Sequence, residues 1–107
     1  SLHDALPIYV LAKFGSRDYD VACMNSKQAK TLRAVFADPV SRTIEWAAIE
    51  SLLVAVGSRT IEGKGSAVKF ELDDLVVRFH RPHPGKEAKP YQVKDARLFL
   101  TKIGVTP

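Results

Sequence analysis

Residues 59–79 read Arg-Thr-Ile-Glu-Gly-Lys-Gly-Ser-Ala-Val-Lys-Phe-Glu-Leu-Asp-Asp-Leu-Val-Val-Arg-Phe. Within this stretch, short segments with a period of two alternate with tight turns: Arg59–Glu62, the turn Gly63–Ser66, Ala67–Leu72, the turn Asp73-Asp74, and Leu75–Phe79. The pattern predicts a three-stranded antiparallel sheet in which each strand pairs with the next.

Two apolar stripes with helical spacing precede the predicted sheet. Ser26 is predicted to cap the first helix, which ends at Asp38-Pro39 because proline disfavours the α region in the residue before it. Gly57 is predicted to stop the second helix in the left-handed conformation. The inward-facing residues of the two stripes are Ala29, Leu32, Val35, Phe36, Trp46, Ile49, Leu52, Leu53 and Val56.

A last helix is predicted from Tyr91 to Ile103, after a proline-rich loop at His80–Pro90, with Gly104 as its cap. The order α-α-β-β-β-α indicates an α+β fold with helices on one side of a three-stranded sheet, in two layers. Two layers leave no room for an enclosed cavity, so chemistry is expected on the open sheet face or in the turns. The residues of the last helix expected to face inward are Val93, Ala96, Leu98, Phe99 and Leu100.

Composition and charge narrow the class of protein. The chain has 107 residues, enough for one domain, and 46% of them are hydrophobic. The longest apolar run, Ala5–Ala12, is too short to span a membrane. The single cysteine excludes a disulfide framework and a cysteine-rich zinc site. Sixteen Lys and Arg against 12 Asp and Glu give a net charge of +4, which favours a polyanionic partner.

The first 23 residues are expected to lie outside the domain. Ser1–Ile8 resembles a translated sequencing adapter, and Met24 is the only methionine. We interpret residues 1–23 as a non-native or upstream leader and residues 24–107 as one domain. The alternative is a signal peptide, but no Lys or Arg precedes the apolar run, and the segment after it is a poor cleavage region.

Basic residues indicate a surface for nucleic acid across the hairpin, the following loop and the last helix. The alternative is an ordinary solvated face. The turn Gly63–Ser66 lacks the spacing of a nucleotide-binding loop, which excludes an NTPase. The residues predicted to contact RNA are Lys64, Ser66, Lys69, Arg78, Arg81, Lys86 and Lys89.

The loop after the third strand contains two histidines in the sequence His80-Arg-Pro-His83-Pro. Two imidazoles are an incomplete ligand set, so no metal site is expected. A histidine here suits general acid or base chemistry near neutral pH, with Arg81 and Lys86 beside it to hold a phosphodiester. The alternative is that both are solvated loop residues.

From Met24 to Pro107 the chain resembles the HicA family of type II toxin–antitoxin toxins. The resemblance implies a double-stranded-RNA-binding-like fold, metal-independent cleavage of mRNA in the cytoplasm without a small-molecule cofactor, and neutralisation by a HicB-type antitoxin. The segments that carry it are Met24-Asn-Ser-Lys27, Phe36-Ala-Asp-Pro-Val40, Ile44-Glu-Trp46, Gly63-Lys-Gly-Ser66, Phe79-His-Arg-Pro-His-Pro84, Lys86-Glu-Ala-Lys89 and Phe99-Leu-Thr-Lys-Ile-Gly104.

One position departs from the family pattern. The usual catalytic histidine of the family follows a Gly-Ser pair at the start of the second strand, where this chain has Ala67. The resemblance matches His83-Pro84 to the His-Pro of the family, so we predict His83 as the main proton-transfer residue and His80 as its partner. The alternative is a non-catalytic RNA-binding or antitoxin-binding module on the same fold.

Overall fold

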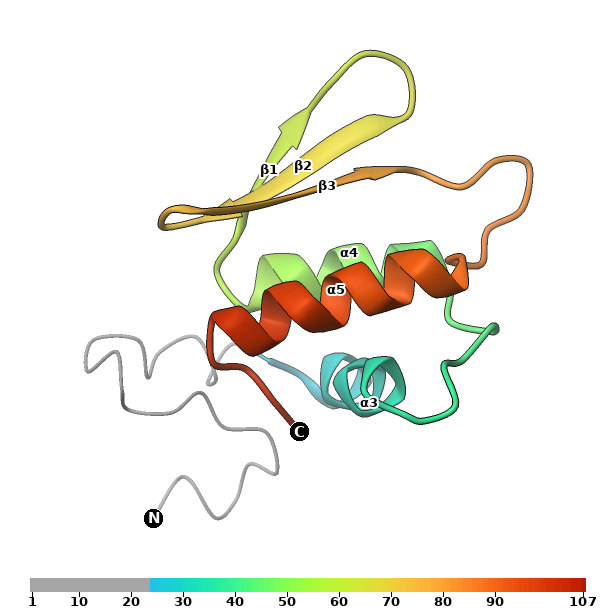
Figure 1. Ribbon diagram of the computed structural model, residues 1–107, viewed down its shortest axis with the longest axis vertical. Helices are drawn as coiled ribbons and strands as arrows, with labels where there is room; N and C mark the ends of the chain where they lie inside the picture. Colours follow the sequence, from blue (N-terminus) through green and yellow to red (C-terminus); the bar gives the residue numbers. More distant parts are fainter. Residues whose placement is uncertain (1–23) are drawn as a thin grey trace.

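A computed structural model describes residues 24–107, and the prediction about the leader falls on residues outside this range. The element order confirms the predicted α+β fold (Figure 1). β3 includes His80, one residue more than predicted, and the last helix begins at Pro90. The elements are α3 (Ser26–Val35), α4 (Trp46–Ala55), β1 (Arg59–Glu62), β2 (Ala67–Leu72), β3 (Leu75–His80) and α5 (Pro90–Lys102).

The sheet has the strand order β1-β2-β3, with both pairs antiparallel. Val68 and Phe70 of β2 are buried, so these positions and their cross-strand partners face the helices. Because side chains alternate along a strand, Ala67 and Lys69 face the other way, onto the open side of the sheet. His80 and Arg78 lie on that same side, since they pair with Ala67 and Lys69.

The helices form two tiers on one side of the sheet (Figure 1). α4 and α5 lie next to the sheet, and α3 packs against α4 and α5 on their far side. This differs from the two layers expected, because the apolar stripe of α3 covers helices rather than strands. The aromatic centre of the core is Trp46, whose ring lies 4.8 Å from that of Phe79 and 6.4 Å from that of Phe70.

Polar contacts satisfy backbone groups at both ends of α3, and those at its C-terminal end tie it to α5. Asn25, rather than the predicted Ser26, caps the helix by accepting a hydrogen bond from the Gln28 backbone N–H (2.8 Å). At the other end, the guanidinium of Arg97 on α5 donates to the carbonyls of Val35 and Ala37, both at 2.9 Å. A cation at a helix C-terminus satisfies carbonyls that have no partner within the helix.

One predicted core residue is wrong. Leu98 on α5 is 54% exposed, whereas its neighbours Phe99 and Leu100 are buried. Five apolar residues in the stretch 93–100 span more of the helix circumference than the sheet and α3 cover, so one of them faces solvent. Gly57 has the positive φ angle predicted for it, 102°, and Gly104, predicted as the cap of the last helix, has a φ of 87°.

We predict that Leu32→Ala lowers the free energy of unfolding by about 2–5 kcal/mol, because Leu32 is fully buried where α3 meets the other helices. The matched change Leu98→Ala is expected to alter it by less than about 0.5 kcal/mol. Urea unfolding followed by circular dichroism measures both. Equal effects of the two substitutions would show that α3 is not part of the cooperative core.

Candidate functional site

The start of β2 and the end of β3 meet at one end of the open sheet face. Ala67 pairs directly with His80, and the Arg81 N–H extends the ladder by donating to the Ser66 carbonyl (2.9 Å). The His80 imidazole is exposed, with Nδ1 lying 3.4 Å from the Ser66 hydroxyl. The structure therefore places an imidazole beside Ala67, from the neighbouring strand.

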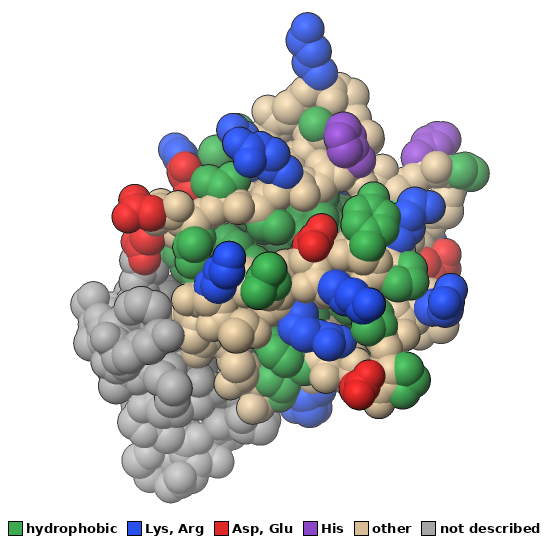
Figure 2. Space-filling model, in the orientation of Figure 1, with side chains coloured by type: hydrophobic (Ala, Val, Ile, Leu, Met, Phe, Trp, Pro, Cys, Tyr) green, Lys and Arg blue, Asp and Glu red, His purple; other side chains and the backbone are tan. Residues whose placement is uncertain are grey.

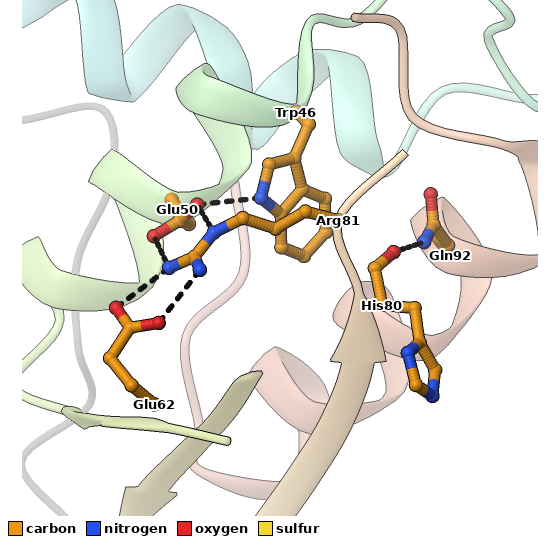
Figure 3. A network of polar contacts seen from close by, with 6 residues as sticks. All are labelled: Trp46, Glu50, Glu62, His80, Arg81 and Gln92. Atoms are coloured by element: carbon orange, nitrogen blue, oxygen red, sulfur yellow. Dashed lines mark hydrogen bonds and ion pairs between the residues drawn. The ribbon is translucent and has the colours of Figure 1, made fainter. Parts of the chain in front are cut away.

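The backbone of His80 is fixed by a buried glutamine. Gln92 on α5 has no exposed surface, and its Nε2 donates to the His80 carbonyl at 2.7 Å (Figure 3). Its Oε1 accepts from the Lys89 N–H at 2.9 Å, just before the helix begins. Sequence reasoning missed Gln92, although glutamine at the third position of a helix is typical of a capping box.

The guanidinium of Arg81 lies between two carboxylates (Figure 3). It donates to Glu50 on α4 at 2.8 and 3.0 Å and to Glu62 at the end of β1 at 2.7 and 2.9 Å. Glu50 also accepts from the Trp46 indole N–H at 2.6 Å. Bidentate pairing of this kind is strong and geometrically specific.

This pairing shifts the ionisation of all three side chains. The Arg81 hydrogen bonds lower the pKa of Glu50 and, likewise, the pKa of Glu62 below the ordinary value of 4.5. The two carboxylates in turn raise the pKa of Arg81 above that of a free arginine. Arg81 was predicted to contact RNA, but its donors are directed at Glu50 and Glu62, and its side chain leaves β3 in a different direction from His80 (Figure 3).

Two basic side chains lie directly opposite each other on the open sheet face. Lys69 of β2 pairs with Arg78 of β3, next to the Ala67–His80 pair. Among residues 24–107, neither has a carboxylate oxygen within 4.0 Å, because the nearby Glu71 pairs with Arg59. Figure 2 shows Lys and Arg side chains spread over the face of the molecule that it presents, with imidazoles also at the surface.

The hairpin turn that presents Lys64 and Ser66 depends on its two glycines. Gly65 has a φ of +58°, in the left-handed region that favours glycine. A Cβ on Gly63 would lie 3.0 Å from the Cβ of Ala67, so this position needs glycine for close approach. The turn is thus explained as a hairpin, as predicted, with both polar side chains exposed.

The remaining predicted site residues, His83, Lys86 and Lys89, are exposed on the segment between β3 and α5. Lys86 Nζ lies 3.7 Å from Glu45, a weak surface pair. Among the described residues, no hydrogen bond or ion pair holds the His83 side chain. The structure therefore brings together Lys64, Ser66, Lys69, Arg78 and His80, but it does not bring Arg81 into the same group.

Within the described range, no group of three or more His, Cys, Asp or Glu side chains is arranged to hold a metal ion. In the same range, no helix is long and apolar enough to cross a membrane.

We predict that Glu50→Gln lowers the free energy of unfolding by about 1–2 kcal/mol at pH 7. The glutamine amide is uncharged and has one acceptor oxygen, so it cannot accept hydrogen bonds from both Arg81 nitrogens as the carboxylate does. The pKa of Glu50 is lower in the folded state, so its carboxylate stabilises the fold fully above pH 4.5 and loses this contribution as the pH falls through the lowered pKa. The difference between the two proteins should therefore shrink as the pH falls below 4.5 and through the lowered pKa of Glu50.

Thermal unfolding of both proteins across this pH range measures the effect. Glu87→Gln is the control, since Glu87 is exposed and Arg81 does not contact it. A Glu50→Gln deficit that stays constant as the pH is lowered to the acid limit of the fold would contradict a stabilising role of the charged carboxylate.

Residues 46–105, from the first residue of α4 to just after α5, match the sequence model of a protein family described as "HicA toxin of bacterial toxin-antitoxin". The chain has no significant match among curated proteins or solved structures. The family match covers more than half of the 107 residues and includes the sheet, His80, the Arg81 contacts and Gln92. The chain therefore belongs to the HicA family of toxins from bacterial toxin–antitoxin systems.

Proposed function

We propose that residues 24–107 form an RNA-directed toxin that cleaves mRNA without a metal ion, in the cytoplasm, and is neutralised by a HicB-type antitoxin. The RNA surface of this proposal is the open face of the sheet. The observation that carries it is the Lys69–Arg78 pair beside the Ala67–His80 pair.

Like charges directly opposite each other destabilise a sheet. Lys69 and Arg78 therefore cost stability unless an anion lies over them. A phosphodiester backbone supplies such an anion, and releasing its counterions makes binding favourable at low salt. We propose that Lys69 and Arg78 contact the RNA backbone directly, with Lys64, Ser66, Lys86 and Lys89 around them. Because of its two carboxylate partners, Arg81 is left out of this set.

The proposed reaction is attack of a ribose 2′-hydroxyl on the adjacent phosphorus. A base removes the 2′ proton as the 2′ oxygen bonds to phosphorus, and an acid protonates the 5′ oxygen as its bond to phosphorus breaks, giving a cyclic phosphate and a free 5′-hydroxyl. Ala67 cannot transfer a proton. We propose that His80 takes over the role of the missing histidine, because it extends over the same face from the position directly opposite.

This assignment differs from the prediction from sequence, in which His83 was the main proton-transfer residue and His80 its partner. Three observations support His80: the Ser66 hydroxyl beside its ring, the Gln92 hydrogen bond to its carbonyl, and the ladder bond from the adjacent Arg81 to Ser66. Positioning of this kind lowers the cost of orienting a catalytic group. We assign the second proton-transfer role to His83, which lies in the loop that directly follows β3.

We predict that His80→Ala lowers the rate of RNA cleavage by about 100-fold or more, the usual contribution of a general acid or base, with little change in RNA affinity. Adding Ala67→His to this variant should recover at least about tenfold, because it restores an imidazole at the same end of the sheet. Single-turnover cleavage of a labelled RNA in EDTA measures both rates.

His83→Ala is the matched comparison and should lower the rate less than His80→Ala. A protein that cleaves normally without His80 but not without His83 would reinstate the order predicted from sequence. Loss of activity in both variants with no recovery by Ala67→His would instead indicate that His80 supports the structure only.

The RNA surface predicts a specific salt dependence. Lys69→Ala and Arg78→Ala should each weaken RNA binding and reduce the slope of log affinity against log salt by about 0.7–0.9, one released counterion each. Lys30→Ala, an exposed change on α3, should leave the slope unchanged. Fluorescence anisotropy with a labelled RNA hairpin at several salt concentrations measures the slopes. Equal slopes for all three variants would remove the open sheet face from the proposal.

The second candidate function is a non-catalytic module that binds RNA or an antitoxin. Ala67 favours it, since a family member that has lost its histidine can retain its surface. Wild-type protein that binds the RNA hairpin but leaves it intact in the single-turnover assay would support this candidate over the nuclease.

A further inference from the structure

The outer edge of β3 has unpaired backbone groups. Arg81 donates to the Ser66 carbonyl, so these two residues form a hydrogen-bonded pair of the ladder. Antiparallel pairs alternate, which makes Lys69–Arg78 and Glu71–Val76 non-hydrogen-bonded pairs. The backbone groups of Val76 and Arg78 therefore point outward, to the side where β3 has no neighbouring strand.

The hydrogen bond to the His80 carbonyl supports the same assignment of hydrogen-bonded and non-hydrogen-bonded pairs. That carbonyl also belongs to a non-hydrogen-bonded pair, and it points outward to accept from Gln92. α5 thus closes the edge at His80. Among the described residues, nothing closes it in the same way at Val76 and Arg78. A free edge of this kind is a template for another strand.

An apolar groove runs beside this open part of the edge. Residues 75–77 of β3 form one wall, and Asp95, Leu98, Phe99 and Lys102 of α5 form the other, around a volume of about 110 Å³. Val76 and Leu98 are 39% and 54% exposed, two of the few large apolar side chains at the surface. Figure 2 shows hydrophobic surface in this orientation between the level of the sheet and that of α5.

The charges around the groove indicate what kind of strand would fit. Arg78 has no carboxylate partner in the described chain and lies on the edge itself. A strand beside β3 would place one side chain opposite Arg78, where an acidic residue is favourable. The residue two positions along lies on the same open face, opposite Val76, and the residue between the two faces α5 and Leu98, so apolar side chains are favourable at both of these positions. A second copy of this basic chain offers Arg78 no acid from its own β3, Leu75–His80.

We propose that the antitoxin adds an extended segment to the edge of β3, with an acidic side chain opposite Arg78 and an apolar side chain in the groove at Leu98. Val76 and Arg78 each exchange N–H···O bonds with this segment, which supplies affinity, while the groove supplies selectivity. The inference rests on the family membership, which implies an antitoxin, and on the proposed RNA surface for its consequence. An acid on Arg78 removes one of the two charges proposed to hold RNA, so binding of the segment and binding of RNA compete.

The first test uses Leu98→Asp with the HicB-type antitoxin encoded beside the gene. The charge in the groove should raise the dissociation constant at least about tenfold in calorimetry without RNA. Val54→Asp is the matched control, because Val54 is 53% exposed on α4, and it should leave the constant unchanged. Leu98→Asp should cleave RNA at the wild-type rate.

The second test addresses the backbone. Val76→Pro removes an outward N–H that the β2–β3 ladder does not use, so the fold should persist while antitoxin binding falls about tenfold or more. Val76→Thr keeps the N–H and should bind normally. Unfolding temperatures check that both variants fold. If Val76→Pro unfolds the protein, slowed hydrogen exchange at the Val76 and Arg78 amides of the wild-type complex replaces it as the measure.

Three results would overturn the proposal. Equal antitoxin affinity for Leu98→Asp and Val54→Asp would place the antitoxin elsewhere. A dimer of the toxin alone that Leu98→Asp abolishes would show that a second copy covers the edge. If Leu98→Asp binds RNA more weakly but binds the antitoxin normally, the groove belongs to the RNA site instead. Because affinity for antitoxin is measured without RNA, an inactive nuclease leaves this test intact.

Discussion

The double carboxylate pairing of Arg81 is the contact on which the candidate site depends. It joins three elements that are distant in sequence: α4 through Glu50, the end of β1 through Glu62, and the chain directly after β3. A guanidinium can satisfy two carboxylates at once because its five donors lie in one plane. Without it, the last residues of β3 would be held to the helix layer by the Gln92 hydrogen bond and by the packing of Phe79 on Trp46. The exposed imidazole of His80 is therefore attached to a stretch of backbone that is held by contacts to both α4 and α5.

Side chains alternate between the two faces of the sheet at this end of β3, so three adjacent residues make three different kinds of contact. Phe79 packs in the aromatic core, His80 faces the open side, and Arg81 turns back to the carboxylates. The same alternation underlies the proposal that His80 serves in place of a histidine at position 67. Positions directly opposite in an antiparallel pair project from the same face, only about 4.5–5.5 Å apart at Cβ. A replacement from a neighbouring residue on β2 itself would face the core.

Sequence reasoning succeeded where local patterns decide the structure. The bounds of β1 and β2 follow from period two and from glycines at 63 and 65, and the stop at Gly57 follows from its conformational freedom. It failed where contacts between distant segments decide. Arg81 and Lys69 are both basic residues near a turn, and only the packing of α4 shows that one of them meets carboxylates and the other does not. Leu98 was misplaced for a related reason: the helix period does not reveal how much of the circumference its neighbours cover.

The attachment of α3 has a consequence for synthesis of the protein. The carbonyls at the end of α3 are satisfied by Arg97, 62 and 60 residues further along the chain, and the His80 carbonyl is satisfied by Gln92. During synthesis, the carbonyls at the end of α3 and the carbonyl of His80 therefore gain these hydrogen bonds only after α5 has left the ribosome. Long-range closure of this kind slows folding. It also means that a frameshift or early stop at any codon before α5 produces a chain that has neither contact.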